Sequence, residues 1–361
     1  MIIGSFIILI SSLTDILTSF LRAEQRTKLF NIIGIIRRYS SLALGIFLFF
    51  YLVKGLYGFF FGQLITGLAI LFLLLYLFKE KIRLKRENIS LDSIKASIGF
   101  GLPLVWAEFG HLALNYADRY LVQFYLGSVS LGLYTAAYNL STHVTEVIIY
   151  PINYAMTPIY MNILVNKGAE KTKEFFAKMF RYFLLIIIPV AVGFIAIGKE
   201  TLMFLASSKY IEAYPVLPYV VVGQSIYACT IILNSGLFIN KKTYILNNIM
   251  ILTCLFNIGL NVFLIPRFGI VGAAQATLLS YVLYAIVITY YAFREFSFTI
   301  DFRRIIRYAI AASIMFIAVK NIHFQVASLN LLCQIGVGAV TYALFVLLLD
   351  KEIRQSLFSS S

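Results

Sequence analysis

The feature that constrains this chain most is a succession of long apolar runs separated by short polar segments. The runs have the length that an α-helix needs to cross the hydrocarbon core of a bilayer. They are continuous and rich in Leu, Ile and Phe, without the alternation of a barrel strand, so they predict helices. The sequence therefore predicts an all-α polytopic membrane protein with about eleven transmembrane helices. The predicted spans are residues 2–21, 29–53, 56–78, 97–125, 130–165, 176–198, 214–238, 244–265, 269–292, 305–320 and 326–349.

The composition excludes a soluble domain. Hydrophobic residues make up 61% of the 361 residues and charged residues only 13%, whereas soluble domains are about a quarter charged. The net charge of +14 does not predict a nucleic-acid partner, because the basic residues lie in short segments between the apolar runs. The tendency of basic loops to stay in the cytoplasm explains them instead.

The connecting segments alternate between rich and poor in basic residues. Because loops with an excess of Lys and Arg remain on the cytoplasmic side, the rich segments are expected to face the cytoplasm. This predicts a multi-pass protein with its C-terminus in the cytoplasm. The rich segments lie at residues 22–28, 79–95, 167–178, 241–242, 294–307 and 351–354, and the poor ones hold Lys54, Lys199, Lys209, Arg267 and Lys320.

An internal repeat relates the first three predicted helices to three later ones. Residues 19–31 align with residues 235–247, and residues 55–64 align with residues 269–278 at nearly the same offset. The first three predicted helices therefore correspond to three spans within residues 214–292, a parallel duplication of the kind that transporters use. Three predicted helices precede the second copy and none precedes the first. We expect either a fragment or a start assigned too late, with a true eleven-helix protein as the alternative.

Three segments resemble signatures of one transporter family. Residues 115–141 hold Asp118-Arg119, then glycines and a Gly-x-Tyr-x-x-Ala pattern, and residues 21–26 (LRAEQR) and 264–281 (LIPRFGIVGAAQATLLSY) resemble further signatures. They are similar to those of the Wzx-type lipid-linked oligosaccharide flippases of the multidrug/oligosaccharidyl-lipid/polysaccharide (MOP) exporter superfamily. The resemblance covers essentially the whole chain, aligned to all but the first three helices of the family.

The resemblance implies a two-bundle, MATE-like transporter architecture with an incomplete N-terminal bundle. The expected parts are a partial N-terminal bundle at 1–78, a basic cytoplasmic linker at 79–96 and a six-helix C-terminal bundle at 97–292. Two trailing helices and a cytoplasmic tail then follow at 293–361.

The resemblance also implies a location, the cytoplasmic membrane of a bacterium or archaeon, and a function. Family members move an undecaprenyl-pyrophosphate-linked sugar repeat from the cytoplasmic to the outer leaflet for O-antigen, capsule or exopolysaccharide assembly. The expected partners are this lipid-linked oligosaccharide, the bilayer and other polysaccharide assembly proteins, with a proton or sodium gradient as the driving force and no cofactor. A multidrug or cation exporter of the same superfamily is the alternative. An integral membrane enzyme is not expected, because the short external loops hold no convergent acid and base residues.

Two adjacent arginines lie well inside the second predicted span. Arg37 and Arg38 are candidates for substrate binding, because a cation at this depth could hold a pyrophosphate by charge-assisted hydrogen bonds. Such charges rarely face lipid. The alternatives are snorkelling to the cytoplasmic interface or an ion pair within the bundle.

Three further charged residues lie inside predicted spans. Asp118 and Arg119 are adjacent, so their side chains diverge on a helix and need not pair with each other. Arg119 is a substrate candidate and Asp118 an ion-coupling candidate, with an ion pair to a neighbouring helix as the alternative. Asp15 reads as a lone carboxylate among Ser and Thr, which could bind a proton or sodium ion or accept a tertiary hydrogen bond.

Tyr134 and Tyr138 share one helical face with Ser141 and Thr145. Aromatic rings with hydroxyl groups suit sugar faces, so the two tyrosines are candidates for oligosaccharide contact. The alternative is an ordinary structural role, because tyrosines are common in membrane proteins.

A polar stripe marks the predicted span at 97–125. Glu108, His111, Asn115 and Asp118 fall on one face of this helix. Glu108 and His111 are one turn apart, a spacing at which a carboxylate and an imidazole can share a proton. We expect the stripe to line a cavity, with this pair as a proton-coupling site. A buried hydrogen-bond network to neighbouring helices is the alternative.

Overall fold

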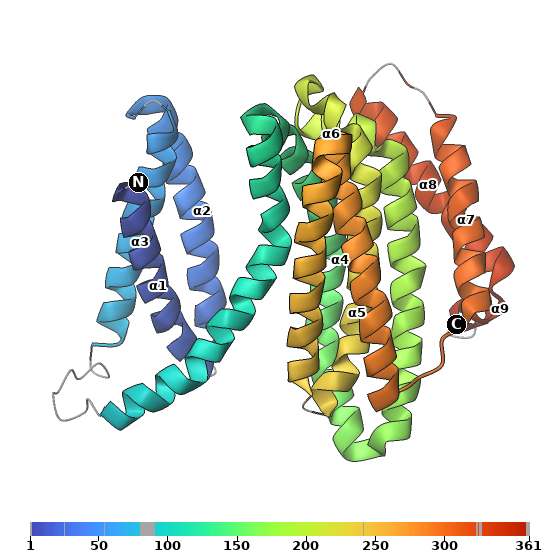
Figure 1. The fold of residues 1–361 in the computed structure, drawn as a ribbon, viewed down its shortest axis with the longest axis horizontal. Helices are drawn as coiled ribbons and strands as arrows, with labels where there is room; N and C mark the ends of the chain where they lie inside the picture. The colour runs from blue at the N-terminus through green and yellow to red at the C-terminus, as the bar shows by residue number, and fades with distance from the viewer. Residues whose placement is uncertain are drawn as a thin grey trace. The chain divides into compact units, whose positions relative to one another are not determined.

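The computed structural model describes residues 2–24, 26–53, 55–79, 91–240, 242–322, 324 and 327–358, which form helices without a strand (Figure 1). The chain divides into two compact units, unit 1 at Met1–Gly99 and unit 2 at Phe100–Ser361. The elements are α1 (Ile2–Ala23), α2 (Thr27–Tyr51), α3 (Leu56–Leu77), α4 (Leu91–Leu205), the 3₁₀ helix η2 (Ser208–Val216), α5 (Leu217–Ile239), α6 (Thr243–Glu295), α7 (Phe302–Lys320), α8 (Ala327–Leu349) and α9 (Lys351–Phe358).

Glycines set the helix contact of unit 1. Gly58 and Gly62 of α3 have the small-xxx-small spacing that lets membrane helices approach closely. A Cβ atom on Gly62 would lie 2.5 Å from the backbone nitrogen of Gly45, and one on Gly58 would lie 2.6 Å from that of Phe49. Only glycine fits at either position, so α2 and α3 are in backbone contact here.

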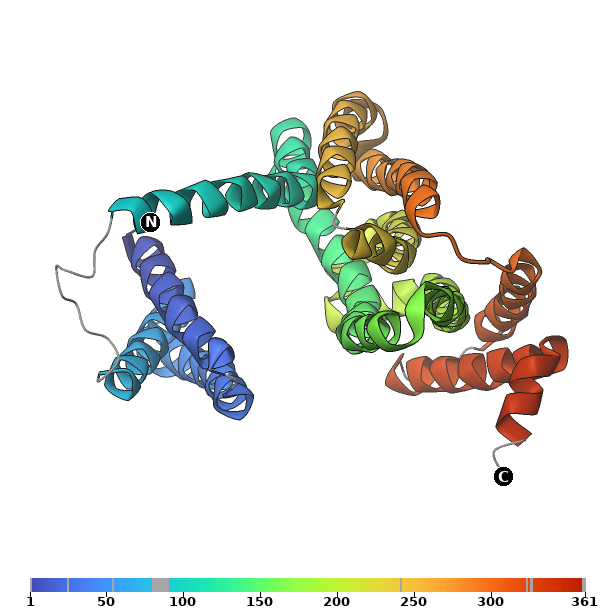
Figure 2. The same cartoon turned by 90° about the horizontal axis from the view of Figure 1, so that it is seen from below.

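The helix α3 is the centre of unit 1. It packs against both α1 and α2, which contact each other much less, as the two cartoon views show (Figures 1 and 2). A small apolar core lies where the three helices meet, built from Leu17 and Leu21 of α1, Ile33 of α2, and Ile70 and Leu74 of α3. Because α1 and α2 share few contacts, a groove remains between them.

The two longest helices are interrupted at glycines. Gly127 and Gly168 in α4 and Gly269 in α6 have φ angles of 79°, 81° and 61°, a region that L-residues with a Cβ rarely adopt. Figure 1 shows the chain reversing direction within both helices. Each glycine lies at a boundary that the sequence predicts between two successive spans.

Seven helices of the described part of the chain are long and apolar enough to cross a membrane. Two of these, Ile159–Leu205 and Tyr244–Glu295, run across the breaks at Gly168 and Gly269, so the count of eleven spans stays a prediction. The predicted all-α class is confirmed by the described residues.

The helix α8 packs on α4 within unit 2 and donates a hydrogen bond to its backbone. Pro189 has no N–H group, so the carbonyl of Leu185 lacks its usual helical partner. The Tyr342 hydroxyl of α8 donates to this carbonyl at 2.9 Å. Met315 of α7 and Tyr342 also belong to the main apolar core, which contains Ile187 of α4. The backbone group freed by the proline is thereby satisfied by a neighbouring helix.

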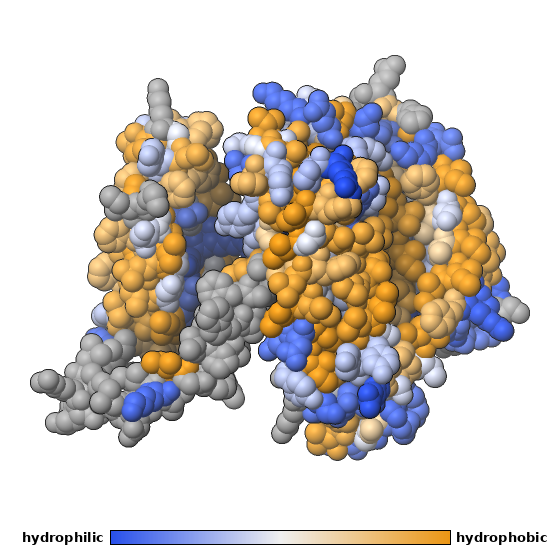
Figure 3. Space-filling model, in the orientation of Figure 1, coloured by the Kyte–Doolittle hydropathy of each residue, from blue (hydrophilic) through white to orange (hydrophobic). Residues whose placement is uncertain are grey.

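The surface of unit 2 is that of a membrane protein. Apolar side chains cover the middle of the face seen in Figure 3, and polar side chains gather at its two ends. Exposed residues such as Leu255, Ile286 and Tyr290 of α6 contribute to its apolar surface. Ion pairs from Lys242 to Glu295 and from Arg181 to Glu352 bring basic segments of unit 2 together. This is the arrangement required if these segments share one side of the membrane.

Candidate functional site

Unit 1 contains a groove of about 690 Å³ that is lined by both intramembrane arginines. Arg37 and Arg38 come from α2, while Ser11 of α1 and Gln63 and Thr66 of α3 add polar groups. The groove is therefore both cationic and rich in hydrogen-bonding groups. Its remaining lining residues are Ile7, Ile10, Gly34, Tyr39, Ser41, Leu42, Phe59, Leu64 and Gly67.

Asp15 is not the lone carboxylate that the sequence suggests. Its Oδ1 atom accepts a hydrogen bond of 2.7 Å from Nη1 of Arg37, so α1 and α2 are joined by an ion pair. The hydroxyls of Thr18 and Ser19 donate to the backbone carbonyl of Asp15, which leaves its carboxylate to the arginine. The Asp15 side chain is 67% exposed and that of Arg37 is 28% exposed, so the pair remains accessible.

Arg38 differs from its neighbour. It is exposed and lines the groove, and no carboxylate in the described part of unit 1 forms an ion pair with it. The groove is therefore lined by one arginine that is paired with an acid and by a second that forms no ion pair among the described residues.

Asp118, in contrast to Asp15, is almost fully buried. It is 1% exposed, and its Oδ2 atom accepts a hydrogen bond of 2.5 Å from the Tyr134 hydroxyl, with Tyr134 itself fully buried. The two residues lie on the two arms of α4 that meet at Gly127. The hairpin brings the carboxylate and the phenol to the same depth in unit 2.

Arg119 turns away from Asp118, as the sequence predicts. Its Nη2 atom donates to Oδ1 of Asn139 at 2.9 Å, and its guanidinium lies 4.7 Å from the ring centre of Tyr116 and 5.0 Å from that of Tyr138. Stacking on aromatic faces stabilises a cation at low dielectric. Arg119 is only partly buried, so its edge is available to a ligand of unit 2.

Tyr134 and Tyr138 lie in the core of unit 2. Their exposed fractions are 0% and 3%, and their rings are 5.6 Å apart. Nε2 of Gln224 on α5 donates to the Tyr138 hydroxyl at 3.3 Å. Ser141 and Thr145 on the same face are also buried. The shared face is therefore present, while direct sugar contact by the tyrosines stays a prediction.

Three residues of the predicted polar stripe cannot be placed. The side chains of Glu108, His111 and Asn115 lie outside the described residues, so their cavity and proton-coupling roles stay predictions. Asp118, the fourth member, is buried inside unit 2.

The sequence interpretation missed a set of buried amides. Asn257 donates to the Ser280 hydroxyl at 3.1 Å, and Asn261 donates to Oδ1 of Asn257 at 2.9 Å, all within α6. Gln224 is buried on the adjacent α5. The available signal was an amide inside an apolar run, which is costly in lipid and therefore faces the protein interior.

Asp118 and several amides lie buried among apolar helices that are long enough to cross a membrane, which is the pattern of a multi-pass membrane protein. The profile of the family described as polysaccharide biosynthesis protein matches residues 1–215. The chain belongs to this family, and the resemblance to Wzx-type flippases is confirmed.

Two curated relatives agree with this assignment. An uncharacterised membrane protein of Methanocaldococcus jannaschii is 24% identical over 204 residues, covering 56% of this chain and 39% of the relative. A protein described as "Probable flippase AglR" from Haloferax volcanii is 26% identical over 213 residues, covering 55% of this chain and 43% of the relative. The matches thus span less than half the length of these relatives.

Solved structures show the fold. The lipid II flippase MurJ in an inward closed conformation matches with a TM-score of 0.79 at 17% identity, over 97% of this chain and 74% of that one. A MATE multidrug transporter in an outward-facing conformation gives 0.51 at 16% identity, over 77% and 65%. A MOP superfamily transporter from Pyrococcus furiosus gives 0.53 at 16% identity, also over 77% and 65%. At these identities the likeness concerns the fold alone.

Proposed function

We propose that this chain takes part in moving an undecaprenyl-pyrophosphate-linked oligosaccharide repeat unit from the cytoplasmic to the outer leaflet. The products served are O-antigen, capsule or exopolysaccharide. The observation that carries the proposal is the groove of unit 1, in which Arg37 and Arg38 face a polar cavity inside predicted membrane spans. Its support is membership of the polysaccharide biosynthesis family.

The groove suits a pyrophosphate for electrostatic reasons. Guanidinium groups bind phosphate oxygens in a bidentate manner, and such charge-assisted hydrogen bonds are about twice as strong as neutral ones. Ser11, Gln63 and Thr66 can hydrogen-bond the phosphate oxygens or the first sugar. In unit 2, Arg119 with its stacked tyrosines is a second candidate contact for the substrate.

Asp15 gives the groove a means of release. The carboxylate holds Nη1 of Arg37 at 2.7 Å, so a pyrophosphate that binds this nitrogen competes with Asp15. A bound phosphate is in turn expelled more easily when a carboxylate competes for the same arginine. Asp15 and Asp118, with Glu108 and His111, are the proposed sites at which a proton or sodium gradient drives the cycle.

A specific observation disfavours the cation exporter. Such a transporter needs a carboxylate that is free to bind a cationic drug. Asp15 is paired with Arg37, and Asp118 is buried behind Tyr134. Among the described residues, the lining of the groove of unit 1 includes two arginines and no carboxylate. Its polarity fits an anionic substrate.

Transport in proteoliposomes tests the proposal. A fluorescent polyprenyl-pyrophosphate-linked oligosaccharide is placed in one leaflet, and its appearance in the other is measured with an impermeant glycosidase. Binding of the same substrate to the detergent-purified chain is measured in parallel. Replacing both arginines (Arg37→Ala with Arg38→Ala) should lower affinity at least tenfold, while Arg267→Ala, at an exposed arginine outside the groove, should change nothing. Failure of the wild-type chain both to bind and to move the substrate would refute the proposal.

A further inference from the structure

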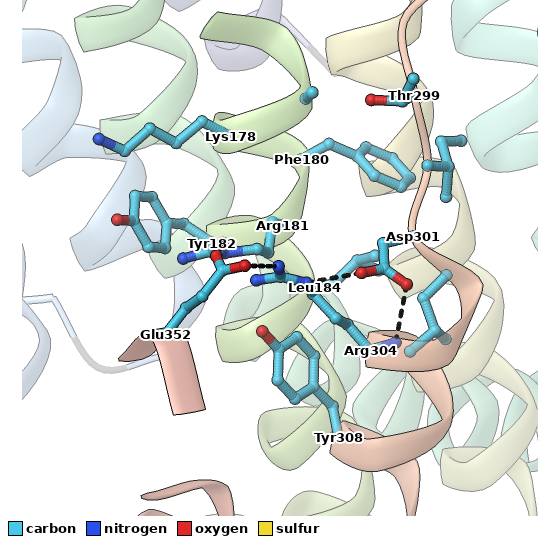
Figure 4. A pocket seen from close by; sticks show the side chains of 13 residues that line it. Lys178, Phe180, Arg181, Tyr182, Leu184, Thr299, Asp301, Arg304, Tyr308 and Glu352 are labelled. Atoms are coloured by element: carbon cyan, nitrogen blue, oxygen red, sulfur yellow. Dashed lines mark hydrogen bonds and ion pairs between the residues drawn. The ribbon is translucent and has the colours of Figure 1, made fainter. Parts of the chain in front are cut away.

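A pocket of about 550 Å³ in unit 2 is lined by residues of three basic segments (Figure 4). It is formed by α4, the segment before α7, the first turn of α7, and α9. Lys178, Arg181 and Arg304 supply cationic lining groups, and Asp301 and Glu352 supply the carboxylates. None of these residues belongs to the groove of unit 1.

The charged groups are held in place by helix caps. Asp301 is the N-cap of α7, accepting from the backbone nitrogens of Arg303 and Arg304, and its carboxylate also binds Nε of Arg304 at 2.7 Å. Asp350 caps α9 by accepting from the backbone nitrogen of Glu352 at 3.2 Å. Both caps follow the preference of helix N-termini for aspartate.

Glu352 joins three helices through the two arginines. Its carboxylate accepts 2.8 Å from Arg181 of α4 and 2.5 Å from Arg304 of α7. The close-up view shows this carboxylate beside Arg181, with Asp301 and Arg304 on the facing wall (Figure 4). The hydrogen bonds of Arg304 and Arg181 hold the pKa of Glu352 below its usual range.

The pocket contains a cationic group without an ion-pair partner and N–H donors without a hydrogen-bond partner among the described residues, and these could bind an anion. Lys178 is exposed, and no described carboxylate forms an ion pair with it. Within the described residues, Nε of Arg181 and Nη1 of Arg304 are buried without a hydrogen-bond partner, although Nη1 lies 3.7 Å from Asp350. Buried donors of this kind normally have partners. Among the lining residues, three cationic groups outnumber two carboxylates.

The walls of the pocket are apolar. Phe180 and Leu184 of α4 and Ile300 and Ile305 beside α7 line it together with the charged groups. A pocket that joins apolar walls to cations at the end of membrane helices matches an amphiphile better than a fully hydrated anion. Basic pockets between transmembrane helices on the cytoplasmic side bind the headgroups of anionic lipids.

We propose that this pocket binds the phosphate headgroup of an anionic phospholipid, with Lys178 and Arg181 as its main contacts. The glycerol and first acyl carbons lie against Phe180 and Ile305. The bound lipid holds α7 and α9 against α4. This site is separate from the proposed transport of an oligosaccharide and does not depend on it.

Lipid binding by the full chain tests the proposal. The purified protein is titrated with phosphatidylglycerol and, separately, with phosphatidylcholine, and bound lipid is counted by native mass spectrometry. The test variant combines Lys178→Ala with Arg181→Gln, which leaves Glu352 paired with Arg304. The control is Lys171→Ala, an exposed lysine of the same basic segment that does not line the pocket. Circular dichroism confirms that each variant is folded.

The binding measurements distinguish a lipid site from a site for a free anion. We expect phosphatidylglycerol to bind the wild type and the control, to bind the double variant at least tenfold more weakly, and phosphatidylcholine to bind none of them tightly. Equal binding of phosphatidylglycerol to the wild type and the double variant would overturn the proposal. Displacement of the lipid by millimolar inorganic phosphate would also overturn it, because the site would then recognise a free anion.

Discussion

Unit 1 and unit 2 each place a carboxylate inside a predicted span, but the two carboxylates differ in partner and in exposure. Asp15 pairs with Arg37 across two helices and is 67% exposed, whereas Asp118 is 1% exposed and accepts from Tyr134. An exposed ion pair can be exchanged for another anion with little loss of stability. A buried carboxylate that loses its donor is costly. We infer that unit 1 provides the exchangeable anion site and that Asp118, besides its proposed role in ion coupling, is part of the framework of unit 2.

The largest effect on stability is expected at the buried site. Tyr134→Phe removes the donor to Asp118 without changing the shape of the ring, so it should lower the free energy of unfolding by about 1–3 kcal/mol. Tyr290→Phe, at an exposed tyrosine of the same unit, is the matched control and should have no measurable effect. Denaturant unfolding in micelles, followed by circular dichroism, provides the comparison. Equal stability of the two variants would show that Asp118 does not depend on Tyr134.

A smaller effect is expected in unit 1. Asp15→Asn removes the charge of an exposed ion pair, and such pairs contribute about 0.2–1 kcal/mol. The same unfolding measurement should therefore show a loss of no more than about 1 kcal/mol. A loss as large as that of Tyr134→Phe would remove the distinction between an exchangeable and a framework carboxylate.

The smallest effect is expected at Asp301 and Glu352, the carboxylates of the lipid pocket, which lie outside the predicted membrane spans. Hydrogen bonds from Arg304 lower the pKa of Asp301 and, together with those from Arg181, that of Glu352. Because both pKa values are lowered by folding, their contribution is present at neutral pH and is lost as the pH falls through the lowered values, below about pH 4. Both groups are exposed, so the effect is small.

Spin labels can follow the position of α9. Cysteines introduced at Gln355 of α9 and Phe302 of α7 report the distance between the two helices, after the three native cysteines are replaced. We expect the same distance at pH 7 and pH 5 and a broader distribution below about pH 4. Glu352→Gln should broaden the distribution already at pH 7. A distance that stays fixed in both cases would rule out a role of Glu352 in holding α9.

Much of the fold could be predicted because it follows from local properties of the sequence. Run length and apolarity identified the helices, and the chain reverses at Gly127, Gly168 and Gly269, which lie between or at the ends of the predicted spans. The divergence of Asp118 and Arg119 was also predictable, since neighbours on a helix point in different directions.

The pairing of side chains was harder to predict. Arg37 reaches Asp15 only because of the rotation of α1 and α2 about their axes, which packing on α3 decides. Tyr134 pairs with Asp118 because the break at Gly127 folds two arms of α4 together. A hairpin centred on Gly127 would predict that Asp118 and Tyr134 lie at the same depth in unit 2. The burial of the Gln224 amide depends on contacts between separate helices, so it produces no periodic pattern in the sequence.

The central claim is that Arg37 exchanges Asp15 for the phosphate of a substrate, and the affinity of Asp15→Asn for the polyprenyl-pyrophosphate-linked oligosaccharide tests it most directly. Removing the competing carboxylate frees Arg37, so the account predicts tighter binding than in the wild type, by up to about fivefold for a pair of this strength. The binding should weaken again when Arg37→Ala is added. Weaker binding by Asp15→Asn alone would contradict the account, because Asp15 would then support the substrate site instead of competing for it.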